Sequence, residues 1–160
     1  MMRRFLKHEE EGRFGVLLLC GDHDPGGLHI TGTLRKNLED LSGAVDWDPG
    51  NLEIIRFGLN ADFIDAHDLT WIDNLETSSG GQLDDPGHND HAKQYVQDYI
   101  AQFGARKCEA NALVVEPDVG RQLCRNAILE HIPADAVERY QRNLDRARKQ
   151  LRRALRERVL

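Results

Sequence analysis

An unbroken apolar run at residues 16–20 leads directly into the polar segment 21–27, which reads Gly-Asp-His-Asp-Pro-Gly-Gly. A short apolar run that is bounded by Gly and Pro is typical of a buried parallel strand. Asp22 and Asp24 then follow the carboxyl end of a core strand, where open α/β sheets place their ligand crevice. The sequence therefore predicts a strand at residues 16–20 whose end carries a functional pair of aspartates.

The spacing of the two aspartates favours a metal site. Residues two apart in an extended chain point the same way, so the carboxylates of Asp22 and Asp24 converge, and a hard cation such as Mg²⁺ or Mn²⁺ relieves their repulsion. Gly26 and Gly27 allow a tight turn into a helix that is expected to begin near Leu28, and its free N–H groups favour a phosphate. The alternative is an ordinary strand-to-helix turn, because Asp, Pro and Gly are favoured there as well.

Four other residues are weaker candidates for the site. His23 lies between the aspartates and points to the opposite face of a regular strand, so we expect it to pack or to orient its neighbours rather than to act as an acid or base. Glu109 is the remaining candidate carboxylate. His88 and His91 form a His-x-x-His pattern in an acidic loop, a weak alternative metal site because turns also favour Asp, Gly and His.

The order of the predicted elements favours an α/β fold with a mainly parallel sheet flanked by helices. A polar stretch at residues 74–91 is long enough to be a functional or mobile loop. Asn60 is expected to cap a short helix through Asp65. The other expected helices span residues 28–41, 92–103, 117–131 and 133–160; the expected strands span 16–20, 52–57 and a strand or strand approach at 107–112 that leads into the apolar run 113–115.

Composition limits the class of protein. The chain has 160 residues, of which 40% are hydrophobic and 30% charged, and no apolar run approaches the length of a membrane span. Cys20, Cys108 and Cys124 are an odd number without Cys-x-x-Cys spacing, so we expect reduced, mostly buried thiols in a cytoplasmic protein. We expect one globular domain at residues 1–132 and a basic helix at residues 133–160.

The predicted C-terminal helix is basic, whereas the rest of the chain is acidic. Residues 134–160 hold nine Arg or Lys and four Asp or Glu, whereas the rest of the chain holds 12 basic and 23 acidic residues. An acidic body does not favour broad contact with nucleic acid. The helix is expected to pack on its own domain, to mediate self-association or bind a partner helix, or to contact phosphate. Its apolar residues follow heptad-like spacing at Val137, Tyr140, Leu144, Ala147, Leu151 and Ala154.

Three segments, taken in order, resemble the TOPRIM domain of the type VI DNA topoisomerase A subunit and of the related meiotic transesterase. Residues 16–27 are similar to the strand that ends in Gly-Asp-x-Asp-Pro-x-Gly, residues 56–69 to the following strand, turn and short helix, and residues 107–113 to the Glu-x-x-Ala-Leu element. The resemblance implies a Rossmann-like fold. It also implies that Asp22 and Asp24 join an acidic residue from an earlier strand to hold Mg²⁺ beside a DNA phosphate. The element with Glu109 closes the domain near the sheet in that family, so the resemblance implies that Glu109 supports the metal ligands rather than binds the ion.

The sequence also departs from that family. Residues 1–12, which include three glutamates at positions 9–11, are expected to be the tail of a preceding helix or a solvated lead-in, not the strand that carries the catalytic Glu of a TOPRIM domain. Tyr95, Tyr99 and Tyr140 match nothing in the winged-helix region that supplies the nucleophile in those topoisomerases. We therefore expect the N-terminal part of the domain to be missing.

Three functions follow as hypotheses. The first is the C-terminal part of a Mg²⁺-dependent, topoisomerase-like DNA-processing protein that is not catalytic alone. The second is a noncatalytic DNA-associated or assembly module that uses the C-terminal helix. The third is a stand-alone Mg²⁺-dependent TOPRIM nuclease, whose third carboxylate would be Glu109 or an acid of the long loop.

Overall fold

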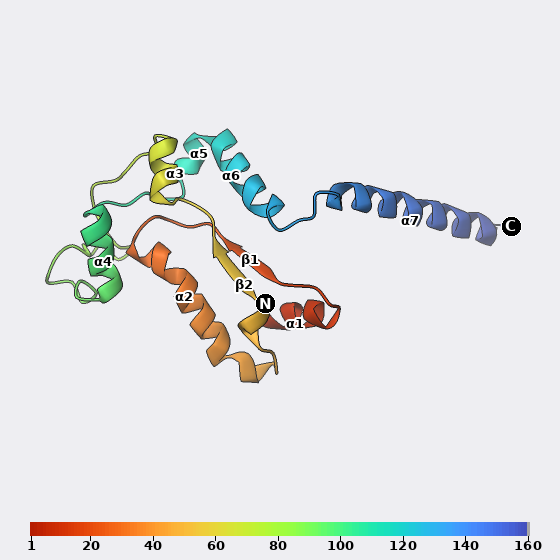
Figure 1. Cartoon of the computed structure of the whole chain (residues 1–160), viewed down its shortest axis with the longest axis horizontal. Helices are drawn as coiled ribbons and strands as arrows, with labels where there is room; N and C mark the ends of the chain where they lie inside the picture. The colour runs from red at the N-terminus through yellow and green to blue at the C-terminus, as the bar shows by residue number, and fades with distance from the viewer. Residues whose placement is uncertain (160) are drawn as a thin grey trace. The chain divides into compact units, whose positions relative to one another are not determined.

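The structure of the chain is a computed structural model that describes the backbone of residues 1–159 and the side chains of residues 1–156. Within this range it has seven α-helices and two short β-strands, and the mixed α/β class that the sequence predicts is confirmed (Figure 1). The elements are α1 (Met2–Glu10), β1 (Val16–Leu19), α2 (Pro25–Asp40), η1 (Ser42–Ala44), η2 (Pro49–Asn51), β2 (Glu53–Arg56), α3 (Ala61–Ala66), α4 (Gln94–Phe103), α5 (Ala112–Val115), α6 (Pro117–Leu129) and α7 (Ala136–Val159).

The two strands form a parallel pair, in agreement with the predicted strand direction. Val16 pairs with Glu53 and Leu19 with Arg56, so the strands end together. Helix α2 makes the crossover between them, as parallel strands require. Figure 1 shows α1 near the amino ends of the strands, and α3 and α4 beyond their carboxyl ends.

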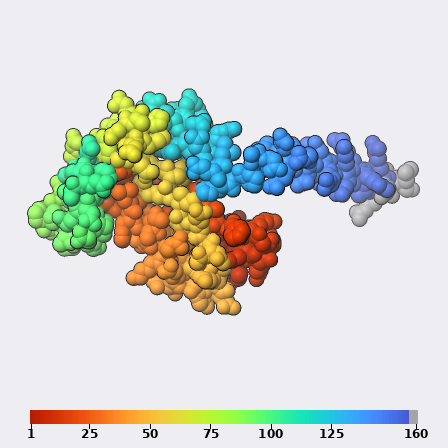
Figure 2. Space-filling view, viewed as in Figure 1, coloured from red at the N-terminus to blue at the C-terminus, as the bar shows by residue number. Residues whose placement is uncertain are grey.

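One hydrophobic cluster lies at the amino ends of the strands. Leu38 of α2, Trp47 and Leu52 are buried, and α1 packs its apolar side chains, Phe5 among them, against this cluster. Figure 2 shows the N-terminal segment against the segment around residues 45–52. The prediction of a helix tail or solvated lead-in at residues 1–12 is therefore correct for the helix and wrong for the solvated lead-in, because the apolar side chains of α1 are partly buried against this cluster.

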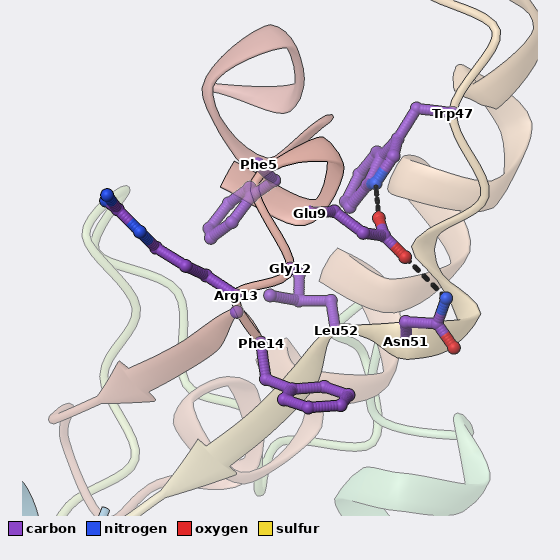
Figure 3. Close-up of a pocket in the computed structure, with 9 residues that line it drawn as sticks. Phe5, Glu9, Gly12, Arg13, Phe14, Trp47, Asn51 and Leu52 are labelled. Atoms are coloured by element: carbon purple, nitrogen blue, oxygen red, sulfur yellow. Dashed lines mark hydrogen bonds between the residues drawn. The ribbon is translucent and has the colours of Figure 1, made fainter. Parts of the chain in front are cut away.

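Glu9 joins α1 to the turn before β2. Its carboxylate accepts hydrogen bonds from the indole N–H of Trp47, at 2.7 Å, and from the side-chain amide of Asn51, at 2.5 Å (Figure 3). Phe5 stacks on Trp47 with 5.7 Å between ring centroids. A small cavity of about 220 Å³ lies beside these residues. Glu9, one of the three N-terminal glutamates, thus holds α1 against the turn before β2.

A second hydrophobic cluster packs near the carboxyl ends of the strands. Its buried members are Leu59, Ile64, Leu69 and Cys108, so it joins the segment around α3 to the segment that follows α4. The long loop at residues 74–91 lies between these parts in sequence and contains no helix or strand, as predicted.

Several predicted details are wrong. Helix α2 begins at Pro25 rather than near Leu28, because Asp24 caps it and proline is favoured at the first helical position. Residues 112–115 form a short helix and no strand. Lys107 and Cys108 instead make isolated antiparallel bridges, with Ile72 and His23 respectively, and the chain then turns at Glu109.

Two other corrections concern side chains. Asn60 precedes α3 as its N-cap residue, but its side chain makes no capping bond and accepts a hydrogen bond from Arg56 instead. The cysteines are not mostly buried. Cys108 is buried, whereas Cys20, which follows the end of β1, and Cys124 on α6 are exposed.

The chain divides into two compact units, Met1–Arg125 and Asn126–Leu160. The division falls within α6, earlier than the boundary predicted between residues 132 and 133. The second unit contains α7, which has 24 residues and confirms the predicted long C-terminal helix. Leu160, the end of that predicted helix, lies outside the described residues.

In the part of the chain that the structure describes, none of the helices has the length and apolar character of a membrane span.

Candidate functional site

The segment that follows β1 alternates its side chains between a cleft and the protein core. Asp22 and Asp24 both line a cleft of about 520 Å³ at the carboxyl ends of the strands, whereas His23 is only 2% exposed. The rest of the cleft is lined by the first turns of α2 and α4, by the loop after Asn74 and by residues 107–109. The structure therefore brings the two predicted metal ligands to one surface.

Each aspartate is held by a backbone amide. Oδ1 of Asp22 accepts a hydrogen bond from the N–H of Ala110 at 2.6 Å, and Oδ1 of Asp24 accepts one from the N–H of Gly27 at 2.5 Å. The first bond ties the segment after β1 to the distant segment after α4. The second is the N-cap of α2. The hydrogen bonds from Ala110 and Gly27 thus orient both carboxylates, and each bond uses one oxygen of its carboxylate.

The two glycines at the start of α2 differ in what they do. A Cβ atom on Gly27 would lie 2.1 Å from the carbonyl oxygen of Asp22, so only glycine allows the helix to begin this close to the preceding segment. The N–H of Gly27 is engaged by Asp24, which competes with the predicted phosphate contact. Gly26 is exposed and lines the cleft. It stays the better of the two candidates for a phosphate contact.

Arg56 is the residue that organises the backbone around this segment. It is the last residue of β2, and its guanidinium reaches across the end of β1. Its nitrogens donate to five oxygens: the carbonyls of Gly21 (3.2 Å), Asp22 (2.9 Å), Gly27 (3.3 Å) and Gly58 (2.6 Å) and the side-chain carbonyl of Asn60 (2.7 Å). Partial burial lowers the pKa of Arg56, yet an arginine remains protonated at neutral pH.

His23 is buried among aromatic rings. It makes edge contacts with Trp71, at 5.3 Å between centroids, and with Phe103, at 4.6 Å. Its Nδ1 lies 3.0 Å from the hydroxyl oxygen of Tyr99, whose O–H is within 2.8 Å of the carbonyl of His23 and 2.9 Å of the carbonyl of Arg106. Burial, and secondarily Arg56, lowers the pKa of His23, so the ring is neutral at pH 7. The structure gives His23 a packing and orienting position.

Glu109 lies in the lining of the same cleft and is paired with a cation. The ammonium of Lys107 is 3.1 Å from its carboxylate and donates to the carbonyl of Glu76 at 3.0 Å. The hydrogen bond from Lys107 is the main cause that holds the pKa of Glu109 below its usual value. Glu76 and Asp90 also line the cleft. A metal bound by Glu109 would compete with Lys107, and one bound by Asp90 would compete with Lys93, whose ammonium lies 2.8 Å from the Asp90 carboxylate.

His88 and His91 are held by bonds within their own loop. Nδ1 of His88 accepts from the N–H of Asp90 at 3.1 Å, and Nδ1 of His91 donates to the carbonyl of Leu83 at 2.8 Å. The side chain of Gln97 lies 3.3 Å from Nε2 of His91. Among the described residues there is no group of three His, Cys, Asp or Glu side chains placed to hold a metal ion.

Sequence reasoning missed four residues that build this site: Arg56, Tyr95, Tyr99 and Lys107. Arg56 had a signal, because it is a charged residue at the end of an apolar strand that pairs with β1. Tyr95 lines the cleft and stacks on His29 with 4.4 Å between centroids, but its helical spacing resembled that of an ordinary packed face. Lys107 gave no signal, since it reaches the cleft only through tertiary contacts.

Comparison with known proteins does not place the chain in a family: no family description, no curated protein and no solved structure matches it.

The five bonds of Arg56 lead to the first prediction. Arg56→Lys should lower the free energy of unfolding by about 2–4 kcal/mol, because one ammonium cannot reach all the carbonyls that the planar guanidinium serves. Urea denaturation measures this change. Arg3→Lys, at an exposed position on α1, is the control and should change stability by less than about 0.5 kcal/mol. Equal, small changes in the two variants would contradict the role assigned to Arg56.

The lowered pKa of His23 leads to the second prediction. The unfolded chain takes up a proton at about pH 6.5, whereas the folded ring stays neutral to a lower pH. The contribution of His23 to stability is therefore fully present above about pH 6.5 and is lost as the pH falls below that value. In an NMR titration, the imidazole of His23 should still be mostly neutral at about pH 6.5, where a histidine of an unfolded chain is half protonated. Half-protonation of His23 at or above about pH 6.5 would contradict this assignment.

Proposed function

We propose that the cleft beside Asp22 and Asp24 binds Mg²⁺ or Mn²⁺ and holds a phosphate of DNA. In this proposal the chain is the C-terminal part of a TOPRIM-type, topoisomerase- or transesterase-like protein. The observation that carries it is that both aspartates line one cleft at the carboxyl ends of a parallel strand pair. Ligand sites of α/β proteins commonly lie at such ends.

The donor set of the cleft fits a hard divalent cation. Asp22 and Asp24 supply carboxylate oxygens, and Thr77 and Ser78 add hydroxyl groups to the lining. Mg²⁺ usually keeps several water ligands and is bound by one or two carboxylates together with substrate phosphates. The bonds from Ala110 and Gly27 hold one oxygen of each aspartate and so fix the direction of the other.

Residues of this chain would share the binding of the phosphate. Lys107 lies in the cleft lining as a cation that Glu109 positions, so its ammonium can contact a phosphate oxygen. The exposed backbone of Gly26 at the start of α2 adds an N–H group. When bound, the cation would neutralise charge on the scissile phosphate and orient it for in-line attack.

The resemblance of residues 16–27, 56–69 and 107–113 to the TOPRIM domain supports the same function. The parallel strand pair and the aspartates at its end are consistent with a Rossmann-like arrangement of that type. We propose that the catalytic nucleophile for DNA breakage belongs to another part of the complete protein. We also propose a cytoplasmic location, which suits a chain with unpaired cysteines.

One observation favours a second candidate function. Glu76, Asp90 and Glu109 line the same cleft as the aspartate pair, so a third carboxylate is within the lining. A stand-alone Mg²⁺-dependent nuclease requires such a residue. Slow hydrolysis of plasmid DNA by this chain alone, lost in Asp24→Asn, would favour the nuclease.

The metal site is tested by thermal stability. A ligand that binds the folded state at about ten times its Kd adds about 1.4 kcal/mol, so saturating Mg²⁺ should raise the melting temperature by about 3–6 °C. Asp22→Asn and Asp24→Asn should abolish this gain while keeping the fold, because an amide oxygen can still accept the bonds from Ala110 and Gly27.

A matched control is present in the chain. Asp48 also precedes a Pro-Gly pair and caps a short helix, accepting from the N–H of Gly50 at 2.8 Å, but it does not line the cleft. Asp48→Asn should keep the full gain from Mg²⁺. An equal gain in all the variants, or no gain in the unaltered chain, would contradict the proposed site.

A further inference from the structure

Helix α7 carries an apolar stripe that is open to solvent. Val137 is 67% exposed, Tyr140 63% and Leu151 62%, which is far above the exposure of residues packed in a core. Burial against another surface would remove this apolar area from water, which is favourable in proportion to the area. The stripe, which we call the α7 seam, follows steps of three and four residues and consists of Val137, Tyr140, Leu144, Ala147, Leu151 and Ala154. Leu144 is half-buried, and the other five are exposed.

The charges of α7 lie away from the α7 seam. Residues 136–156 contain eight Arg or Lys and two Asp or Glu. The positions that flank the seam at helical spacing are mostly uncharged, with Gln141, Asn143 and Gln150 among them and Arg148 as the exception. Both acids of this stretch are within 3.9 Å of an arginine on the same helix. The seam and its borders are thus nearly neutral on a strongly basic helix.

We propose that α7 pairs in parallel with α7 of a second copy of this chain, as a two-stranded coiled coil along the α7 seam. Val137, Leu144 and Leu151 fill one set of the seam positions, and the small side chains of Ala147 and Ala154 let the two backbones approach closely. Neutral borders remove the like-charge contacts that would otherwise oppose the pairing of two identical basic helices.

The position of Arg148 selects the parallel orientation. In a parallel pair, each Arg148 lies opposite Asn143 of the second copy, five residues earlier in the chain, and can donate to its amide oxygen. In an antiparallel pair the two Arg148 residues, which lie near the middle of the helix, would face each other. The parallel pair avoids this repulsion.

The same charge pattern argues against an anionic partner surface. A helix that lies on a lipid headgroup layer or along a phosphate backbone brings its basic residues to the contact. On α7 the borders of the apolar stripe are instead amides, and basic residues such as Arg142 and Lys149 lie on the opposite face. Pairing with a second copy of the helix buries the α7 seam and keeps these charges apart.

Analytical ultracentrifugation of the full chain tests the pairing. The unaltered chain should show a concentration-dependent monomer–dimer equilibrium, and Leu144→Gln with Leu151→Gln should weaken the dimer more than about tenfold. Arg142→Gln with Lys149→Gln, on the opposite face, is the matched control and should leave the dimer at least as strong. A monomer at all concentrations, or a dimer unaffected by the seam substitutions, would overturn the proposal.

The dependence of association on salt concentration distinguishes a second copy of the chain from an anionic partner. Raising NaCl from about 0.05 M to about 0.5 M should strengthen the dimer, because salt screens repulsion between two basic helices. Binding of the chain to anionic vesicles or to DNA would weaken over the same range. A dimer that weakens with salt, or seam-dependent binding to phosphatidylserine vesicles by a chain that stays monomeric, would overturn the proposed partner.

Cross-linking tests the orientation. Ala154→Cys, in a chain that also carries Cys20→Ser and Cys124→Ser to remove the exposed thiols, should form a disulfide-linked dimer on mild oxidation. The equivalent helix positions meet only in the parallel pair. A cross-link that requires Leu144→Cys on one copy and Ala154→Cys on the other would establish the antiparallel pair and contradict the proposed orientation.

Discussion

The guanidinium of Arg56 is the interaction on which the site depends. A sheet of only two short strands makes few backbone bonds, so it cannot by itself fix the segments that leave it. Arg56 compensates by donating to carbonyls before and after the aspartate pair, at the start of α2 and after β2. One planar side chain thereby sets the path of the backbone that carries Asp22 and Asp24.

The segment after β1 has two functions at once because its side chains alternate. His23 points into the aromatic cluster and exchanges two backbone bonds with Cys108, whereas its two neighbours face the cleft. The bond from Ala110 to Asp22 reinforces the same connection. The position of the carboxylates thus depends on the packing of a buried histidine and on a segment more than eighty residues later.

The sequence was informative where local patterns decide the structure. The apolar run at residues 16–20, the Asp-Pro-Gly turn and the spacing of the C-terminal helix each predicted an element that the structure contains. The sequence was less informative where contacts between residues far apart in the chain decide the structure. The apolar run at residues 113–115 favours a strand, but Lys107 and Cys108 pair with single residues elsewhere, and the chain then turns into α5.

The same difference between local patterns and distant contacts applies to the residues of the candidate site. Asp22 and Asp24 were predictable because strand alternation and the turn after the strand are local properties. Lys107 and Tyr95 were not, since only the folding of the loop at residues 74–91 and of α4 brings them to the cleft. Asn60 shows how tertiary contacts override a local preference, because Arg56 takes the side-chain oxygen that would cap α3.

Paramagnetic relaxation by Mn²⁺ tests whether Asp22 and Asp24 bind a divalent cation. Substoichiometric Mn²⁺ added to the isotopically labelled chain broadens the amide signals nearest to the bound ion. If the aspartate pair binds the ion, the signals of residues 22–27 and 107–110 broaden first, and Asp24→Asn removes this effect. Broadening centred on His88 and His91, or spread evenly over the acidic surface, would contradict the assignment of the cation to the aspartate pair.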